Sequence, residues 1–312
     1  MELLITGASG FIGSALVRLL SQDERYRVRA TYRSLPQLQL ESRISPLLIP
    51  GLSADWDWRR DLLGVEVVVH TAARVHVMDE TVDDPLEAFR QVNVAGTLNL
   101  AQQAAEVGVR RFIFLSSIKV NGEQTPLGRP FSIEDPPNPV DPYAQSKLEA
   151  ESALLQLAAD KGMEVTIIRP VLVYGPGVKG NVQTMIRWVR RGIPLPLGAI
   201  NNRRSLVALD NLLDLIVTTI HHPQAANRRF LVSDGDDVST TELLQRLAVA
   251  LNSPSRLLSV PPAWIQRGAE LLGKRAFAQR LLGSLQVDIA ATRQQLDWTP
   301  PVTMAQGLKQ LV

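Results

Sequence analysis

The stretch TGASGFIG, residues 6–13, decides the fold of this chain. It continues the short apolar run ELLIT (2–6) and opens the helical pattern FIGSALVRLL (11–20), with glycines at GxxGxxG spacing. Small residues let the backbone approach a pyrophosphate, and a helix N-terminus supplies free N–H groups with a partial positive charge. A tight strand-to-helix turn without a ligand is the plainer alternative, but the flanking strand and helix favour a dinucleotide site. The expected cofactor contacts in this stretch are Gly7, Gly10, Phe11, Ile12 and Gly13.

Short β-rich runs alternate with helical patterns along the first 170 residues. The predicted strands are 2–6, 26–32, 47–50, 65–70, 110–117 and 163–170. Between the later strands, apolar residues at helical spacing predict long helices at 85–107 and 143–161. Strands that alternate with helices are typical of a parallel sheet covered on both faces. We therefore predict an α/β fold, a Rossmann-type doubly wound parallel sheet.

The composition changes after Pro170, where Gly/Pro-rich loops occur at 173–181 and 192–198. The remainder reads as short helices with one strand candidate, RRFLVS (228–233). We predict a dinucleotide-binding domain at 1–170, with a return segment near 205–235. A smaller substrate-binding domain should take up most of 171–312 and close over the strand ends.

Composition excludes several classes of function. The chain has 312 residues, 45% hydrophobic and 21% charged, with a net charge of +2, which is ordinary for a globular enzyme and weak evidence for nucleic acid. It has no cysteine, and its four histidines show no HExxH spacing, so we expect no disulfide and no metal site. No apolar run is long enough to span a membrane, and a strand pattern at the N-terminus leaves no room for a signal peptide. We expect a cytoplasmic protein without membrane or nucleic-acid partners.

The end of the second predicted strand bears on which dinucleotide is bound. An NAD site usually has an acid there that holds the ribose 2′-hydroxyl. This chain reads ATYRS (30–34) and has Arg33 instead, whose guanidinium can bind a 2′-phosphate. The pattern favours NADP, with NAD as the alternative if Arg33 is only a solvated residue at a strand end.

Tyr143 and Lys147 are four residues apart near the start of the predicted helix 143–161, so they share one face. A lysine ammonium beside a tyrosine favours the phenolate and should lower the Tyr143 pKa, which lets the tyrosine exchange a proton near neutral pH. Ser117 ends the preceding strand, 26 residues earlier. A YxxxK spacing alone is common. Together with Ser117 it predicts that these side chains converge at the C-terminal edge of the sheet.

With these motifs in place, the chain resembles the extended short-chain dehydrogenases/reductases that act on nucleotide sugars. The resemblance covers nearly the whole length. It rests on TGASGFIG, HTAA (70–73), NVAGT (93–97), the serine strand, Tyr143-xxx-Lys147 and RPVLVYGPG (169–177).

The resemblance implies a role for each matching residue. Tyr143 corresponds to the catalytic acid/base, Ser117 to the residue that holds the substrate oxygen, and Lys147 to the lysine that binds the nicotinamide ribose. Further cofactor-site positions are Ala72, Ala73 and Asn93, the last of which shapes the central helix. Expected substrate contacts are Ser116, Asn181 and Arg204. A homodimer through the two long helices is usual in the family.

Ile118 and Lys119 narrow the reaction. In the family's sugar dehydratases an Asp-Glu pair directly follows the Ser/Thr, and neither residue found here can do that acid/base work. What remains is hydride transfer at one carbon, by a C4 reductase or by a 4-epimerase. Lys119 is either a residue with a new role or a solvated loop residue.

The predicted NADP preference favours a reductase, because an epimerase returns its hydride to one retained NAD. HTAARVHVMDE (70–80) and GSLQVD (283–288) are similar to a bacterial set that reduces UDP-4-keto-6-deoxy-N-acetylglucosamine to UDP-N-acetylquinovosamine for surface polysaccharide, including lipopolysaccharide O antigen. This NAD(P)-dependent reduction is the leading hypothesis. The alternative is a UDP-hexose or UDP-N-acetylhexosamine 4-epimerase. An NADPH reductase of non-sugar ketones and a non-catalytic dinucleotide-binding protein rank below both.

Three positions depart from the family pattern. Leu52 stands where many relatives have an Asp that holds adenine. Leu285 replaces an arginine that contacts phosphate in epimerases, and Arg280 is a candidate substitute. Ser205 replaces the Asp that usually follows the phosphate-binding arginine, here Arg204. We therefore expect a phosphate site that is weaker or differently arranged.

Overall fold

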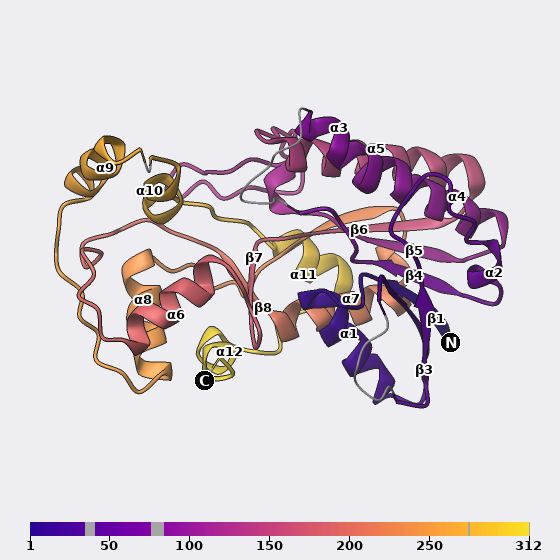
Figure 1. Ribbon diagram of the computed structural model, residues 1–312, viewed down its shortest axis with the longest axis horizontal. Coiled ribbons are helices and arrows are strands. Elements are labelled where there is room, and N and C mark those ends of the chain that lie inside the picture. The colour runs from indigo at the N-terminus through magenta and orange to yellow at the C-terminus, as the bar shows by residue number, and fades with distance from the viewer. Residues whose placement is uncertain (35–40, 76–83, 274, 312) are drawn as a thin grey trace.

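The structure is a computed structural model that describes residues 1–34, 41–75, 84–273 and 275–311. Its centre is a parallel sheet, which contains seven strands in the described part of the chain, in the order β3-β2-β1-β4-β5-β6-β9 (Figure 1). These strands are β1 (Glu2–Thr6), β2 (Arg27–Tyr32), β3 (Ile44–Leu48), β4 (Val67–His70), β5 (Arg111–Leu115), β6 (Glu164–Pro170) and β9 (Arg228–Val232). The predicted Rossmann-type α/β fold is confirmed.

Helices cover both faces of this sheet (Figure 1). On one face lie α1 (Phe11–Ser21), α7 (Leu209–His221) and α11 (Ala290–Leu296), whose apolar residues share a core cluster with β1, β2 and β9. The other face carries α2 (Arg59–Leu62), α4 (Thr97–Glu106) and α5 (Pro142–Lys161), which pack on β4, β5 and β6. Because both faces are covered, the central strands are continuous apolar runs rather than alternating ones.

The predicted elements of the first 170 residues are largely correct. Each predicted strand overlaps an observed one, and the largest shift is at β3, which begins at Ile44 rather than at residue 47. The helix predicted at 85–107 is three segments in succession: α3 (Pro85–Arg90), a π-helical turn (Gln91–Gly96) and α4. The π-turn was not predicted. Of the motif HTAARVHVMDE, residues 76–80 lie outside the described residues.

The C-terminal part of the chain forms a second core beside the sheet. It contains β7 (Leu172–Tyr174) paired with β8 (Leu206–Ala208), and the helices α6 (Asn181–Arg190), α8 (Thr240–Ala250), α9 (Pro262–Leu271), α10 (Arg275–Leu282) and α12 (Met304–Lys309). Short 3-10 turns lie at Ile118–Val120 and Pro223–Ala225. Strand β9 lies in the main sheet beside β6, with Pro170 opposite Val232. The predicted return segment near 205–235 stays a prediction. The domain boundary at residue 170 stays a prediction.

The described residues contain no helix that is long and apolar enough to cross a membrane.

Candidate active site

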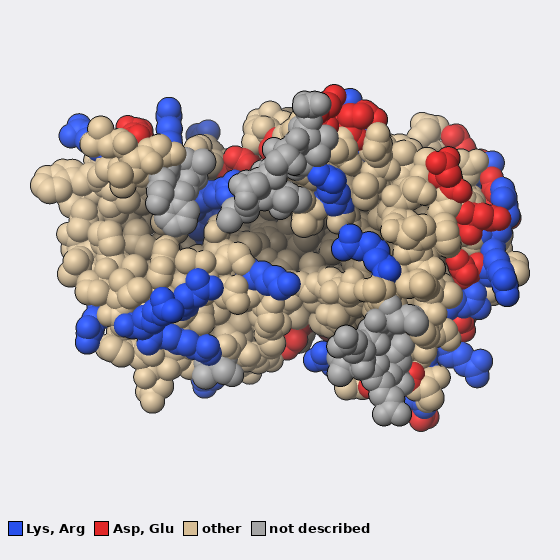
Figure 2. Space-filling view, in the orientation of Figure 1, with Lys and Arg blue, Asp and Glu red and all other residues tan. Residues whose placement is uncertain are grey.

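A cleft of about 550 Å³ opens between the C-terminal ends of the central strands and the second core. Figure 2 shows a hollow near the middle of the viewed face, bordered by several Lys and Arg side chains. The predicted site residues that line this cleft are Ile12, Ala73, Ser116, Ser117, Tyr143, Lys147, Asn181 and Arg204. The others, Gly7, Gly10, Phe11, Gly13, Arg33, Ala72 and Asn93, are not among its lining residues. The tertiary structure thus brings the predicted catalytic residues Ser117, Tyr143 and Lys147 into one cleft with Asn181 and Arg204, which lie far along the chain.

The glycine-rich turn has the shape that close approach of a backbone or phosphate requires. Gly7 has φ +72°, a left-handed conformation that favours glycine. A Cβ on Gly7 would lie 2.8 Å from the backbone of Ala72, and a Cβ on Gly13 would lie 2.2 Å from the carbonyl oxygen of Gly7. Helix α1 follows without a side-chain cap at Gly10, so its first N–H groups face outward. These features fit a dinucleotide pyrophosphate.

Helix α5 carries Tyr143 and Lys147 into the cleft. Its start is fixed by Asp141, whose Oδ1 accepts a hydrogen bond of 2.7 Å from the N–H of Ala144, and by Pro142 in the first turn. Lys147 is buried, donates from Nζ to the carbonyl oxygen of Leu115 over 2.8 Å and lies 4.4 Å from the centre of the Phe114 ring. Burial lowers the Lys147 pKa to about 7. Because this pKa lies near neutral pH, a charged group that binds beside Lys147 can change its protonation state.

The pKa of Tyr143 departs from the prediction. Burial raises it to about 12, and the negative charge of Asp141 acts in the same direction. The predicted lowering by Lys147 is wrong for the protein alone. The physical reason is that desolvation disfavours the phenolate, while the Lys147 ammonium is directed at the carbonyl of Leu115 and is itself weakened by burial. Ser117 lies partly exposed beside them and accepts a bond of 3.3 Å from the N–H of Lys119.

Ser116 lines the cleft, but its hydroxyl is committed elsewhere. It donates to Glu151 Oε1 over 2.5 Å. Glu151 is also held by Arg169, from Nε at 2.9 Å and from Nη2 at 2.5 Å, and all three side chains are buried. Glu151 lies one turn after Lys147 on α5, where its charge raises the Lys147 pKa against the effect of burial. The hydroxyl of Ser116 thus supports Glu151 in this structure, and its contact with substrate stays a prediction.

Asn93 also supports the site from outside the cleft. It lies in the π-helical turn, 1% exposed. Its Oδ1 accepts from the backbone N–H of Arg74 at 2.8 Å, and its Nδ2 donates to the Arg74 carbonyl and to Ser146 Oγ, both at 3.0 Å. These bonds tie the loop after β4 to α5. The role of Asn93 in the cofactor site stays a prediction.

Lys119 is engaged in ion pairs at the cleft wall. Its Nζ lies 2.5 Å from Asp141 Oδ2 and 3.3 Å from Glu123 Oε1, and its side chain is 34% exposed. It therefore neutralises the carboxylate that caps α5 next to Tyr143. Ile118, in the other position of the missing dehydratase pair, is buried in the core.

Arg33 is exposed just after the C-terminal end of β2, which is where the NADP prediction requires it. Arg29 on the same strand takes no part there, since it pairs with Glu2 at 2.9 Å and donates to the Asp61 carbonyl oxygen at 2.8 Å.

On the opposite wall, Arg204 brings a cation into the cleft. Its Nη1 donates to the carbonyl oxygens of Arg280 and Gly283, each at 3.0 Å, and burial lowers its pKa. Arg204 is only partly buried, and these two carbonyl oxygens take up a single nitrogen of its guanidinium. The group therefore has further donors for an anionic ligand.

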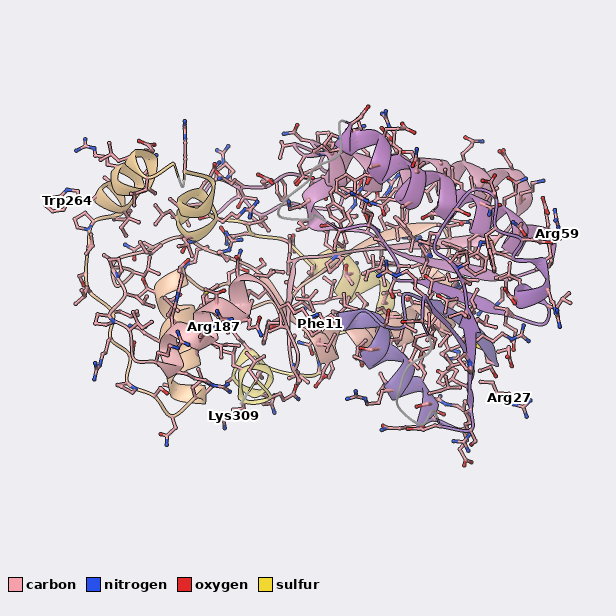
Figure 3. All side chains as sticks on the ribbon, viewed as in Figure 1. Phe11, Arg27, Arg59, Arg187, Trp264 and Lys309 are labelled. Atoms are coloured by element: carbon pink, nitrogen blue, oxygen red, sulfur yellow. The ribbon has the colours of Figure 1, made fainter. Side chains whose placement is uncertain are left out.

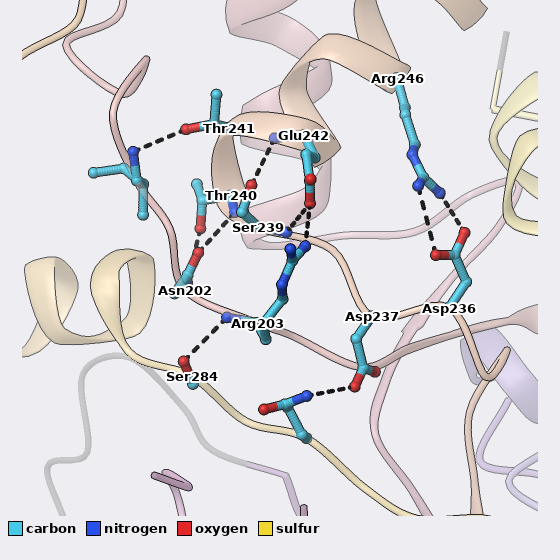
Figure 4. Close-up of polar contacts among 12 residues, drawn as sticks. Asn202, Arg203, Asp236, Asp237, Ser239, Thr240, Thr241, Glu242, Arg246 and Ser284 are labelled. Atoms are coloured by element: carbon cyan, nitrogen blue, oxygen red, sulfur yellow. Dashed lines mark hydrogen bonds and ion pairs between the residues drawn. The ribbon is translucent and has the colours of Figure 1, made fainter. Parts of the chain in front are cut away.

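The two residues that precede Arg204 are anchored by their side chains (Figure 4). Asn202 is buried, accepts from the N–H of Thr240 at 2.8 Å and donates to the Gly283 and Leu281 carbonyl oxygens at 2.8 and 3.1 Å. Arg203 pairs with Glu242 at 2.7 Å. These bonds hold the backbone from which Arg204 enters the cleft.

The structure shows what surrounds each of the three positions that depart from the family pattern. Ser205 donates to Asp237 over 2.5 Å and accepts from the N–H of Val287 at 2.9 Å, so Asp237 supplies the carboxylate that the sequence position lacks. Leu285 and Arg280 both line the cleft, which leaves Arg280 available as the substitute cation. Leu52 is partly buried and packs closely against Gly96 of the π-turn.

Several cleft residues were not predicted. Thr71 lines the cleft and lies inside the motif HTAA, of which only Ala72 and Ala73 were predicted as site residues. Helix α6 contributes Thr184, Met185 and Trp188 to the cleft. These residues follow Asn181 by three, four and seven positions, so they lie on the same helix face as Asn181. Helical spacing from Asn181 could therefore have predicted them. Gln124 and Thr240 come from loops and helix ends without a motif, and no pattern in the sequence marks them.

Comparison with known proteins agrees with this geometry. The family model described as NAD dependent epimerase/dehydratase family matches residues 3–233. The chain is 50% identical over 312 residues to a UDP-glucose 4-epimerase of Vibrio cholerae, covering 99% of this chain and 94% of the relative. It is 28% identical over 320 residues to the GDP-6-deoxy-D-mannose reductase of Pseudomonas aeruginosa, covering 100% of this chain and 96% of the relative.

Solved structures show the same fold. A UDP-glucose 4-epimerase from Thermotoga maritima, crystallised with UDP-glucose, superposes with a TM-score of 0.78 at 23% identity, covering 99% of this chain and 97% of that one. RMD from Pseudomonas aeruginosa, complexed with NADPH, gives a TM-score of 0.73 at 23% identity, covering 100% and 98%. One neighbour was thus solved with a UDP-sugar and the other with NADPH, on one architecture.

Proposed function

The chain belongs to the NAD dependent epimerase/dehydratase family, and from that premise we propose that it acts at C4 of a UDP-linked hexose or N-acetylhexosamine as a 4-epimerase. The observation that carries the proposal is the cleft itself, with Ser117, Tyr143 and Lys147 on one wall and the partly buried cation of Arg204 on the other. The relative that is 50% identical over 99% of the chain is a UDP-glucose 4-epimerase, which supports the choice of reaction. This order reverses the sequence prediction, which placed a 4-keto-sugar reductase first.

The chain's own residues would carry out the proton chemistry. A nicotinamide dinucleotide, when bound, would accept a hydride from C4 and then return it. Tyr143 takes the proton from the C4 hydroxyl and later returns it, and Ser117 holds the same oxygen by a hydrogen bond. Lys147 stands beside the tyrosine as a buried cation near the ribose side of the site. Arg204 holds the diphosphate so that the sugar can turn either face toward the nicotinamide.

The second candidate is the reductase that forms UDP-N-acetylquinovosamine. Exposed Arg33 at the end of β2 favours it, because a guanidinium there suits the NADPH pool on which a net reductase depends. Leu285, in place of an arginine typical of epimerases, points the same way. A reductase of non-sugar ketones is disfavoured by the cation that Arg204 brings into the cleft. Inhibition by UDP tests that alternative directly. The homodimer through the long helices and the cytoplasmic location stay predictions.

The decisive experiment compares two substrates. Purified protein is mixed with UDP-glucose and with UDP-N-acetylglucosamine without added nicotinamide, and the C4 epimers are followed by NMR. In parallel, UDP-4-keto-6-deoxy-N-acetylglucosamine is added with NADPH or NADH, and loss of reduced cofactor is recorded. Interconversion of epimers supports the proposal. Consumption of NADPH by the keto sugar without epimerisation replaces it with the reductase, and Arg33→Ala should then reduce the preference for NADPH over NADH.

A further inference from the structure

Helix α9 carries large apolar side chains that nothing in its own fold buries. All ten residues of α9 are described, and none is buried. Trp264 is 69% exposed, Leu271 is 88% exposed, and Leu272, which follows the helix, is 73% exposed. Residues seven and eight apart on a helix share one stripe of surface. Figure 3 shows Trp264 at the outer end of the molecule, pointing away from its body. A contiguous exposed apolar stripe indicates an interaction surface.

The other side of α9 is anchored to the protein. Ile265 packs against the second core, and α9 contacts α10. Helix α10 in turn supplies Gln279, Arg280 and Leu281 to the wall of the cleft. The exposed side chains of Trp264 and Leu271 are thus held on a helix that packs against the cleft-lining helix α10.

Charge around α9 is strongly positive. The net charge of +2 hides an unequal division: residues 1–170 hold 17 Lys and Arg against 22 Asp and Glu, and residues 171–312 hold 16 against nine. Residues 256–280 hold five Lys and Arg and a single acid, Glu270. Arg267 lies on α9 three residues after Trp264 and four before Leu271, hence beside the stripe, and Arg275 follows at the start of α10; both are exposed.

We propose that α9 docks the protein onto the surface of an anionic phospholipid bilayer, with Trp264, Leu271 and Leu272 at the acyl boundary and Arg267 and Arg275 on lipid phosphates. A helix with Trp and Leu on one side and arginines beside them is the composition of an interfacial helix. The charge separation between the two halves orients the molecule, because the positive half is attracted to an anionic surface and the negative half is repelled.

A second copy of the chain fits this surface less well. A two-fold contact would bring the same positive segment against itself, and like charges that face each other disfavour such an interface. The proposal concerns contact with a bilayer surface and no spanning helix. It revises the sequence expectation of no membrane partner.

The test is co-sedimentation of the full chain with vesicles. We expect binding to vesicles of equal parts phosphatidylglycerol and phosphatidylcholine, little binding to phosphatidylcholine alone, and loss of binding at high salt. Trp264→Ser with Leu271→Ser should abolish it. Arg267→Gln with Arg275→Gln should weaken it about thirtyfold, given the attraction of each surface arginine to anionic lipid.

Matched controls separate this effect from unfolding. Val249→Ser removes an apolar side chain that is 81% exposed on α8, and Arg27→Gln with Arg60→Gln removes two exposed cations from the other half. Neither control should change vesicle binding, and all variants should keep their melting temperature. Absence of binding by the unaltered protein, or equal loss in the controls, overturns the proposal. So does a dimer in sedimentation velocity that only the Trp264 and Leu271 variant disrupts, since the face would then join two copies.

Discussion

Tyr143, Lys147 and Ser117 reach the cleft from a helix and a strand end, whereas Arg204 reaches it from an irregular segment between β7 and β8. On the first wall, the main-chain bonds of the parallel ladder and of α5 hold the side chains in place. On the second wall, the side chains of Asn202 and Ser205 bond to neighbouring segments and fix the backbone between them. The wall assigned to chemistry is thus built by secondary structure, and the wall assigned to binding by a few side chains.

This difference implies different sensitivities. A substitution on the first wall should remove a function and leave the scaffold unchanged, because regular backbone does not depend on those side chains. A substitution of an anchoring side chain on the second wall should move the binding residue itself. Four predictions test this contrast.

The largest effect is expected at Tyr143 on the first wall. Tyr143→Phe removes the proton donor and should lower kcat by about 10²–10⁴-fold, the usual contribution of general acid–base catalysis. Cofactor affinity, measured by fluorescence titration, and the melting temperature should stay near those of the unaltered protein. Turnover at the normal rate would remove Tyr143 from the reaction.

Arg204→Gln should act on binding rather than on the chemical step. Loss of a charge-assisted contact of about 1.5–3 kcal/mol predicts a KM for the UDP-sugar that is about 10–100-fold higher, with a smaller change in kcat. Arg203→Gln is the matched control, since Arg203 turns away to Glu242. Equal changes in KM for the two variants would show that general charge, and not the position of Arg204, holds the nucleotide.

Asn202→Ala tests whether the second wall depends on its anchors. The change leaves the Thr240 N–H and two carbonyl oxygens without their partner, which should cost about 1–3 kcal/mol of the free energy of unfolding. Because Arg204 is adjacent, KM should also rise several-fold. Asn201→Ala, at an exposed neighbour, should do neither. Denaturant unfolding and steady-state kinetics measure the two effects, and a fall in stability with an unchanged KM would refute the coupling.

The smallest expected effect is a shift in the pH dependence of the reaction, caused by substitutions of Lys119 and Asp141. The charge of Asp141 raises the Tyr143 pKa, and Lys119 neutralises that carboxylate at 2.5 Å. Lys119→Met should therefore move the pH midpoint due to Tyr143 upward. Asp141→Asn should move it downward while keeping the helix cap, because Asn caps helices as well as Asp does. Lys119→Arg preserves the charge and should leave the pH–rate profile unchanged. Shifts in the same direction for both charge-removing variants would contradict this electrostatic account.

The sequence predicted those features of the fold and site that depend on a short local pattern of residues. The glycine spacing at 6–13, the strand and helix alternation, and the Tyr143–Lys147 pair all rest on the short-range periodicity of backbone structure. That periodicity placed the strands of the sheet and brought Ser117 to the correct edge. It failed at the π-helical turn around Asn93, where tertiary bonds to Arg74 and Ser146 override the helical pattern.

By itself, then, the amino-acid sequence determined the Rossmann-type sheet, the glycine turn and the positions along α5 that face the cleft. Only the tertiary structure decided the charge state of those groups and the construction of the opposite wall. Burial and the neighbouring Asp141 set the Tyr143 pKa, and Asp237 supplies through space the carboxylate that Ser205 lacks. Desolvation and contacts between distant segments are properties of the packed chain, because residues far apart in the sequence create them.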